Sequence, residues 1–467
     1  MMKNSRRTAI KAGVALGAVG GLGLLAELLK EPVEQIPSVV PPAAGKPVWS
    51  NWSGINRCQP AALLTPQDEQ GIVDIVRSAS GGLRCVGAGH SFTPLVPTDG
   101  TLISLDQLAG IVDHQGLNVR VKGGTRLAQL ERELDALGLA LHNQADIDAQ
   151  SYAGAISTAT HGTGRELQAL HAKVQALRIV TPSGQTIECS TVNQPDLLHA
   201  AQVSLGSLGV ITEATVEVVP AFRLHRQVWL KPLEEMLAIA PDTAKRNRHF
   251  EFFYLPFTGY AAAITHNVYQ GDEVSRPPSA DESMLHDLRQ LRDWAGRFPQ
   301  LRRWLAQKLI DPAQTEEAKD RSWKLLSTSR PSKFNETEFH VPREAGIACV
   351  REVIQALERH NDAYFPVEFR FVKADDAWLS PFYQRDACSI AVHAAGGEAY
   401  RYFADDIEPI YRKYQGRPHW GKLHTHQASD FAGLYPKWKD FLEIRKQYDP
   451  TGRMLNPHLR QVFGVAA

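Results

Sequence analysis

Residues 84–92 read Arg84-Cys85-Val86-Gly87-Ala88-Gly89-His90-Ser91-Phe92. The apolar run Leu83–Val86 predicts a buried strand that leads directly into this turn of small residues. Because Gly87 and Gly89 carry no side chain, backbone amides in the turn can come close to an anion. A helical pattern precedes the strand and no G-x-x-G follows, which argues against a Rossmann dinucleotide fingerprint. A single G-x-G turn does not by itself separate a binding loop from a simple turn.

A second informative stretch runs from Tyr152 to Gly164 and consists largely of small and hydroxyl-bearing residues. It contains no formally charged residue before Arg165. Such a run lets the backbone lie flat against a planar ligand while hydroxyls and amides bind phosphate oxygens. The alternative is a tight crossing of a helix or a strand. The ligand-binding interpretation is favoured, because the threonines and glycines here sacrifice packing and propensity.

Short strands and helices alternate around these stretches from Trp49 to about Leu224. Two helices are expected here, one that starts at Thr65-Pro66 and stops at Gly81 and one over 127–137. Two hairpins are expected to turn at Gln115-Gly116 and at Pro182-Gly184, and a strand is expected over 210–219. Farther along, the patterns predict strands over 222–257 and 335–393, an exposed loop over 271–278, and helices over 279–309, 345–357 and 438–448.

Taken together, these features resemble the FAD-binding domain of the vanillyl-alcohol oxidase superfamily, and most closely the aldonolactone oxidases and alditol oxidase. The motifs that carry the resemblance are Val86-Gly87-Ala88-Gly89-His90-Ser91, Thr98-Asp99-Gly100, Ala159-Thr160-His161-Gly162-Thr163-Gly164, Ser204-Leu205-Gly206-Ser207-Leu208-Gly209-Val210 and Arg417-Pro418-His419-Trp420-Gly421-Lys422. The last of these matches the His-Trp-x-Lys signature of the family. The resemblance covers most of the chain after Trp49 and is thin over 271–329.

The resemblance implies an α+β fold. A PCMH-type FAD-binding domain of two subdomains is expected to precede an α+β substrate (cap) domain with a large mixed or antiparallel sheet. The expected boundaries are 1–30 for a signal, 31–48 for a linker, 49–224 for the FAD-binding domain, 225–398 for the substrate domain and 399–467 for a C-terminal segment that returns to the flavin.

The resemblance also implies that FAD is the cofactor and that His90 forms an 8α-histidyl bond to it. Such a bond raises the flavin potential and prevents loss of the cofactor outside the cell. The alternative is a histidine that only hydrogen-bonds beside noncovalent FAD. The residues expected to bind the cofactor are Gly87, Ala88, Gly89, His90, Ser91, Phe92, Gly154, Ser157, Thr158, His161, Gly162, Thr163, Gly164, Gly209, Val210, Ile211 and His419.

The substrate residues are expected in the second half of the chain. Residues 367–371 alternate, so Glu368 and Arg370 share one face of a strand and can grip a polyhydroxy substrate. A surface ion pair of small energetic consequence is the alternative, whereas the resemblance places the pair against the flavin. By the same resemblance Lys422 reaches the reacting hydroxyl. His393 is either a substrate-holding residue or a satisfied core histidine.

The implied reaction is oxidation of an alcohol carbon of an aldono-1,4-lactone or an alditol. A hydride passes to flavin N5, and oxygen or another acceptor reoxidises the flavin. Arg370 and Lys422 are expected to form a cationic hollow that stabilises the alkoxide, with Glu368 fixing Arg370. The alternatives are another oxidoreductase of the superfamily, and an exported flavin- or sugar-binding protein without turnover.

Charge, cysteines and the N-terminus limit the remaining possibilities. Lys plus Arg equals Asp plus Glu, at 51 each, which argues against a nucleic-acid partner. The five cysteines lack C-x-x-C spacing, so no metal site is expected. Arg6-Arg7 ahead of a Gly/Ala-rich apolar stretch is typical of a twin-arginine export signal, rather than a short anchor or a buried helix. The expected location is the periplasm, with tethering to the inner membrane if the signal stays uncleaved.

Overall fold

A computed structural model describes residues 47–278, 281–328 and 331–466. The predicted export signal, and the predicted linker up to residue 46, lie outside these residues. Within the described ranges, no helix combines the length and the apolarity that crossing a bilayer requires.

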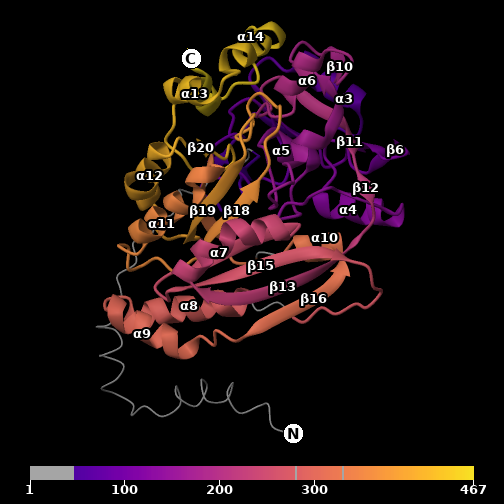
Figure 1. The fold of residues 1–467 in the computed structure, drawn as a ribbon. Coiled ribbons are helices and arrows are strands. Elements are labelled where there is room, and N and C mark those ends of the chain that lie inside the picture. Colours follow the sequence, from indigo (N-terminus) through magenta and orange to yellow (C-terminus); the bar gives the residue numbers. More distant parts are fainter. Residues whose placement is uncertain (1–46, 279–280, 329–330, 467) are drawn as a thin grey trace.

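The first part of the chain, which is the indigo to magenta part of Figure 1, contains a three-stranded and a five-stranded sheet. Two short strand pairs accompany them, β1 (Trp49–Ser50) with β2 (Arg57–Cys58) and β8 (Leu139–Ala140) with β12 (Val219–Pro220). The three-stranded sheet is parallel, in the order β3-β5-β4. Its elements are β3 (Ala62–Leu64), α3 (Glu69–Ser78), β4 (Leu83–Val86) and β5 (Thr101–Ser104). The carboxylate of Asp68 accepts a hydrogen bond from the Gly71 amide at 2.8 Å and so caps α3. The predicted helix start at Thr65-Pro66 is therefore wrong by one turn.

The five-stranded sheet is antiparallel, in the order β10-β9-β11-β7-β6. Its strands are β6 (Ile111–Gln115), β7 (Asn118–Lys122), β9 (Val174–Val180), β10 (Thr186–Ser190) and β11 (Val210–Glu217). Both predicted hairpins, β6–β7 and β9–β10, are confirmed. The accompanying helices are α4 (Leu127–Ala136), α5 (Tyr152–Ser157) and α6 (Pro195–Ala201).

The second part is built on an eight-stranded antiparallel sheet in the order β16-β13-β15-β14-β18-β19-β17-β20. The strands are β13 (Arg223–Pro232), β14 (His249–Leu255), β15 (Tyr260–Tyr269), β16 (Thr315–Arg321), β17 (Phe334–Pro342), β18 (Val367–Val372), β19 (Ala387–Ala395) and β20 (Arg417–Pro418). Apolar side chains on one face form a core with α7 (Leu233–Arg246), α11 (Gly346–Leu357) and α12 (Glu408–Lys413). The α+β expectation, with a large antiparallel sheet, is confirmed.

The two sides of this sheet differ because side chains alternate along each strand. In β14, Phe250 and Phe252 enter the core, whereas Glu251 and Phe253 point to the opposite face. That opposite face contacts the first part of the chain. Two helices, α8 (Asp281–Ala295) and α9 (Pro299–Leu309), lie near β13 and β16 (Figure 1).

The C-terminal residues join the two parts. The short strand β20 pairs with β17, while α13 (Ala428–Leu434), α14 (Trp438–Tyr448) and α15 (Pro457–Phe463) pack into the core of the five-stranded sheet. The guanidinium of Arg84, which is only 3% exposed, donates to carbonyl oxygens of Leu95, Leu205 and Met454. One buried side chain thereby holds together segments that lie far apart in the sequence.

Candidate active site

A cavity of about 1180 Å³ lies between the open face of the eight-stranded sheet and the first part of the chain. Predicted residues from well-separated segments line it. These are His90, Ser91, Phe92, Thr158, His161, Gly162, Thr163, Glu368, Arg370, His393, His419 and Lys422. The four predicted catalytic residues therefore share one cavity with the histidine that was expected to carry flavin.

Nine residues expected to bind the cofactor do not line this cavity: Gly87, Ala88, Gly89, Gly154, Ser157, Gly164, Gly209, Val210 and Ile211. A Cβ on Gly87 would lie 1.9 Å from Ser151 Oγ, so the missing side chain lets Ser151 pack against this turn. A Cβ on Gly209 would lie 2.4 Å from the Val180 carbonyl oxygen. These two glycines permit close chain packing, and a role in cofactor binding stays a prediction.

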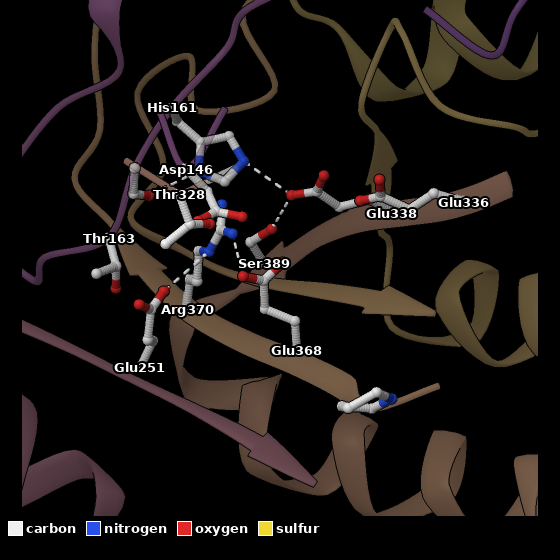
Figure 2. Close-up of polar contacts among 12 residues, drawn as sticks. Asp146, His161, Thr163, Glu251, Thr328, Glu336, Glu338, Glu368, Arg370 and Ser389 are labelled. Carbon is white, nitrogen blue, oxygen red and sulfur yellow. Dashed lines mark hydrogen bonds and ion pairs between the residues drawn. The ribbon is translucent and has the colours of Figure 1, made fainter. Parts of the chain in front are cut away.

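Arg370 lies between two carboxylates. It forms an ion pair with Glu368, two residues away on β18, and its Nε lies 3.1 Å from Glu251 Oε2 on the neighbouring strand β14 (Figure 2). Both Glu368 and Arg370 are buried, so the alternative of a surface ion pair is wrong. Burial raises the pKa of Glu251 to about 7. Burial opposes the charge of Arg370, but Glu368 and Glu251 raise its pKa, so the guanidinium stays charged.

Lys422 is paired in a similar way with Glu336 on β17. Its Nζ also lies 5.1 Å from the centroid of the Phe92 ring. Burial raises the pKa of Glu336, although the Lys422 charge acts in the opposite direction. The fixed positive charges of Lys422 and Arg370 are thus both partly neutralised by buried carboxylates.

His393, on β19, lies at the side of the cavity next to Glu336. Its Nδ1 is 3.1 Å from the Pro366 carbonyl oxygen. Because a carbonyl oxygen only accepts, Nδ1 carries a proton. Nε2 lies 3.7 Å from Glu336 Oε1. His393 lines the cavity, and its role in holding the substrate, rather than as a satisfied core histidine, stays a prediction.

Glu338 accepts hydrogen bonds from two sides. His161 Nε2 lies 2.8 Å from Glu338 Oε1, and Ser389 donates to the same oxygen (Figure 2). His161 Nδ1 faces the Gly162 carbonyl oxygen at 2.8 Å. Burial opposes ionisation of Glu338, but His161 and other neighbouring histidines hold its pKa well below the usual range. Both ring nitrogens of His161 therefore face oxygen atoms, and the ring is held firmly against Glu338.

His419 is held by its own loop. The Gly421 amide donates to His419 Nδ1 at 3.0 Å. Burial lowers the pKa of His419 to about 3, so the ring is neutral at neutral pH. The His-Trp-Gly-Lys segment therefore presents one neutral imidazole and, three residues on, one ammonium group.

The expectation of a cationic hollow is wrong. Nine acidic residues line the cavity, among them Glu251, Glu336, Glu338 and Glu368, and they outnumber the cationic groups of Arg226, Arg370 and Lys422. Sequence reasoning missed Glu251, Glu336 and Glu338. The alternation over 334–341 did carry a signal for two of them, because Glu336 and Glu338 had to share one strand face.

The cavity also offers polar atoms suited to a flavin ring. Asn143 Nδ2, Gln150 Oε1 and Thr160 Oγ1 are buried beside it and have no hydrogen-bond partner within the described part of the chain. Buried polar groups need partners, and the isoalloxazine ring carries both amide-like donors and acceptors. The chemistry of these groups therefore fits FAD.

His90 stands where a flavin bond was expected. Its ring stacks on Trp52 with centroids 5.5 Å apart, and Nδ1 lies 3.1 Å from the Ala88 carbonyl oxygen. Nδ1 therefore carries the proton, which leaves the Nε2 lone pair available. Burial lowers the pKa of His90, which favours the neutral and nucleophilic form of the ring.

Two family models match the chain. The D-arabinono-1,4-lactone oxidase model matches residues 214–462, and an FAD binding domain model matches residues 60–190. The FAD-binding match covers the segments of His90 and His161, and the other covers every predicted catalytic residue.

Curated relatives match along most of their length. The chain is 36% identical to the L-gulono-1,4-lactone dehydrogenase of Mycobacterium tuberculosis, over 90% of this chain and 99% of that protein. It is 31% identical to the L-gulonolactone oxidase of Bos taurus and 28% identical to the alditol oxidase of a Streptomyces species, each over 89% of this chain and 98% of the relative.

A solved structure confirms the fold independently. Cholesterol oxidase from B. sterolicum superposes with a TM-score of 0.73 over 93% of this chain and all of that one, at 18% identity. This similarity supports the arrangement of a PCMH-type FAD-binding domain and a substrate domain, and at that identity it carries no statement about substrate.

Proposed function

Since the chain belongs to the D-arabinono-1,4-lactone oxidase family, we propose that the cavity holds the flavin ring of FAD against a sugar-derived alcohol, an aldono-1,4-lactone or an alditol. The protein is an FAD-dependent oxidoreductase that acts on the alcohol carbon of such a substrate. The observation that carries the proposal is the meeting of His90, Arg370, His393 and Lys422 in one cavity.

FAD, when bound, supplies the two-electron acceptor, with N5 as the atom that receives hydride and with oxygen or another acceptor reoxidising it. The protein side chains have to hold the substrate and manage one proton. Arg370 and Lys422 donate hydrogen bonds to substrate oxygens and favour the alkoxide form of the reacting hydroxyl. His393, which lines the cavity beside Glu336, holds the substrate, and the hydroxyl proton passes to a carboxylate of the cavity.

The charge of the cavity supports a neutral substrate. Nine acidic residues against two arginines and one lysine line the cavity, which gives a negative balance wherever the carboxyl groups are ionised. A sugar acid or a sugar phosphate would be repelled, whereas a neutral lactone or polyol supplies hydroxyl donors to the carboxylates. The two relatives named for gulonolactone match at 36% and 31% identity, against 28% for alditol oxidase, which favours a lactone.

Anaerobic bleaching tests the proposal. The purified yellow protein is mixed without oxygen with gulonolactone, with sorbitol or xylitol, and with the matching aldonate salt. We expect the flavin absorbance to fall with a neutral substrate and to persist with the salt. A flavin that no neutral lactone or polyol reduces would refute the proposal. Hydrogen peroxide formed in air identifies an oxidase, and its absence a dehydrogenase.

We further propose that His90 is bonded to the flavin. The ring nitrogen replaces one hydrogen of the flavin 8α-methyl group. The two hydrogens that leave, one from the imidazole and one from the methyl carbon, are carried away by oxygen as hydrogen peroxide. Acid-precipitated protein should give a yellow fluorescent band on a denaturing gel, and His90→Ala should lose that band. A wild-type gel without fluorescence would refute the bond and leave the reaction proposal standing.

Export by the twin-arginine route to the periplasm is also a proposal. It rests on the residues Arg6-Arg7 and on the apolar stretch that follows them. Replacement of both arginines by lysine should keep the protein in the cytoplasm. Unchanged periplasmic recovery of that variant would contradict the proposal.

A further inference from the structure

The open face of the eight-stranded sheet changes character from strand to strand. On β18 it carries Glu368 and Arg370, and their cross-strand partners on β14 are Phe253 and Glu251. The two rows continue with Ala262 and Ile264 on β15 and with Leu230 and Val228 on β13. All of these side chains line the active-site cavity. In these rows the cavity wall is therefore charged at β18 and aliphatic at β15 and β13.

The helix α8 covers the aliphatic end of this face. Leu285, Leu288 and Leu291 recur every three residues on one side of α8 and line the same cavity. Leu285 and Leu288 also belong to one hydrophobic cluster with Leu230 of β13. The next residue after Leu291, Arg292, is only 2% exposed and bonds Glu398 at 2.8 Å, which fixes the helix in this position. We name this region of the cavity the apolar chamber, and it is lined by Val228, Leu230, Ile264, Leu285, Leu288 and Leu291.

A free sugar held at the charged end does not reach the apolar chamber. The strand order β13-β15-β14-β18 and a spacing of about 4.8 Å between neighbouring strands place Val228 about 14 Å from Arg370. Lys422 lies on the other side of Arg370, because it pairs with Glu336 on β17 and the sheet continues in the order β18-β19-β17. A lactone bound by both cations therefore lies away from the chamber. Water does not suit aliphatic walls either, because a buried water needs several polar partners.

The polar groups at the edge of the apolar chamber indicate a neutral occupant. The guanidinium of Arg226 is ion-paired with Glu316 at 2.6 Å. Glu282 and Asp287 on α8 also line the cavity. A carboxylate or phosphate on the occupant would be repelled by these acidic side chains, whereas an uncharged hydrocarbon chain avoids the repulsion and buries apolar surface.

The apolar chamber is continuous with the substrate region. Phe253 lies directly opposite Glu368, so the apolar surface begins one strand away from the ion pair that is expected to hold the substrate. Directly opposite residues on antiparallel strands lie about 5 Å apart. A chain that leaves the sugar here can follow Phe253 and Ala262 to Leu230 without crossing a charged residue of that row. One molecule with a polar end and an apolar end therefore matches the cavity better than two separate molecules.

We propose that the substrate carries a neutral hydrocarbon chain joined to its sugar portion, and that the apolar chamber binds this chain. Arg370 and Lys422 then hold the alcohol end for oxidation. The inference rests on the proposed function and narrows its substrate class, from free lactones and polyols to those with an alkyl or acyl substituent. The chain supplies binding energy remote from the reacting carbon, so it lowers the concentration at which the site is half-saturated.

Anaerobic stopped-flow reduction of the holoenzyme tests the proposal. The two substrates are gulonolactone, or the polyol that reduces the flavin, and the octanoyl ester of the same compound at its primary hydroxyl. Each methylene group that moves from water into an apolar site contributes about four-fold to affinity. We expect the ester to half-saturate the reduction rate at a concentration at least about ten-fold lower than the parent compound does. Equal half-saturation of the wild type by both compounds would overturn the proposal.

Variants of α8 locate the effect. Leu285→Gln with Leu291→Gln keeps good helix-forming side chains and makes the chamber wall polar. The concentration ratio between parent and ester should then fall to within about three-fold of one. The matched control is Leu301→Gln on α9, at a leucine that is 43% exposed, and it should keep the wild-type ratio. Both variants are compared at full flavin content. A control that loses the ratio, or a chamber variant that keeps it, would contradict the assignment.

Inhibition by glucosides gives a readout that does not require the ester to react. Octyl glucoside, below its micelle concentration, should compete with gulonolactone, and methyl glucoside at the same concentration should not. Octyl glucoside that binds without changing half-saturation by gulonolactone would assign the chamber to a separate molecule, such as an apolar electron acceptor, and would overturn the proposal. If neither parent nor ester bleaches the flavin, the proposed function fails as well. If both do so at equal concentrations, only the chamber inference fails.

Discussion

Replacement of Lys422 by methionine removes the ammonium group that contacts Glu336 and keeps most of the side-chain volume. Lys422 is only 18% exposed, so water cannot easily take the place of its charge. Glu336 then loses its cation, and burial raises its pKa further, so that it becomes a neutral acid. The fold should survive, because a carboxyl group that can protonate avoids most of the cost of an isolated buried charge.

The loss of rate follows from the charges around the alkoxide. A unit charge about 3 Å from the alkoxide attracts it by about 5.5 kcal/mol at an effective dielectric constant of about 20. A carboxylate about 2 Å farther away cancels about 3.3 kcal/mol of that attraction. The remaining ~2.2 kcal/mol corresponds to about 40-fold in rate. Loss of one oxyanion-type donor, about 10²- to 10³-fold, sets the upper limit.

The assay is anaerobic stopped-flow reduction of the enzyme flavin by gulonolactone, or by whichever substrate bleaches the wild type. It measures the chemical step apart from reoxidation. Lys413→Met is the matched control, since Lys413 pairs with Glu352 at 2.7 Å and is 59% exposed on α12. We expect a 40- to 10³-fold slower reduction for Lys422→Met, with full flavin content, and no change for the control. A reduction rate within about three-fold of wild type would refute the role of Lys422 in the alkoxide step.

Two other perturbations test the electrostatics and the packing. The pKa of Glu251 is raised to about 7 in the folded protein. At pH values between the ordinary pKa of a glutamate and about 7, the folded protein therefore keeps a proton on Glu251 that the unfolded chain has lost. The free energy of unfolding should therefore fall as the pH rises through that range. Urea titrations at several pH values should show a smaller fall for Glu251→Gln. The same dependence on pH in the variant and the wild type would contradict a Glu251 that holds a proton in the folded protein. Gly209 has a φ of 140° and no room for a Cβ, so Gly209→Ala should destabilise the protein by about 2–4 kcal/mol in denaturant titrations. Gly138 has a φ of 72° and open space around its Cβ position, so Gly138→Ala should destabilise the protein by only about 1 kcal/mol. Equal losses for the two glycine variants would contradict the steric argument.

Much of the local structure follows from patterns of a few residues. The period of two over 367–371 correctly places Glu368 and Arg370 on one face, and the turn residues near Gly116 and Gly184 correctly predict two hairpins. The motifs around His90, His161 and His419 identify an FAD-dependent oxidoreductase of this family. Each of these signals depends on neighbours within one turn or one strand, which a sequence displays directly.

The chemistry of the cavity depends on contacts that no local pattern contains. Glu251, Glu336 and Glu338 meet Arg370 and Lys422 only because β14, β17 and β18 lie in one sheet, in an order set by long-range pairing. The sign of the cavity charge is a sum over these strands, and composition, which is balanced overall, does not reveal it. The space beside Gly87 belongs to Ser151, which is 64 positions later in the chain. The sequence by itself therefore determined the kind of cofactor and much of the secondary structure. The tertiary structure alone decided which charges face one another, because electrostatic energy depends on distance in space.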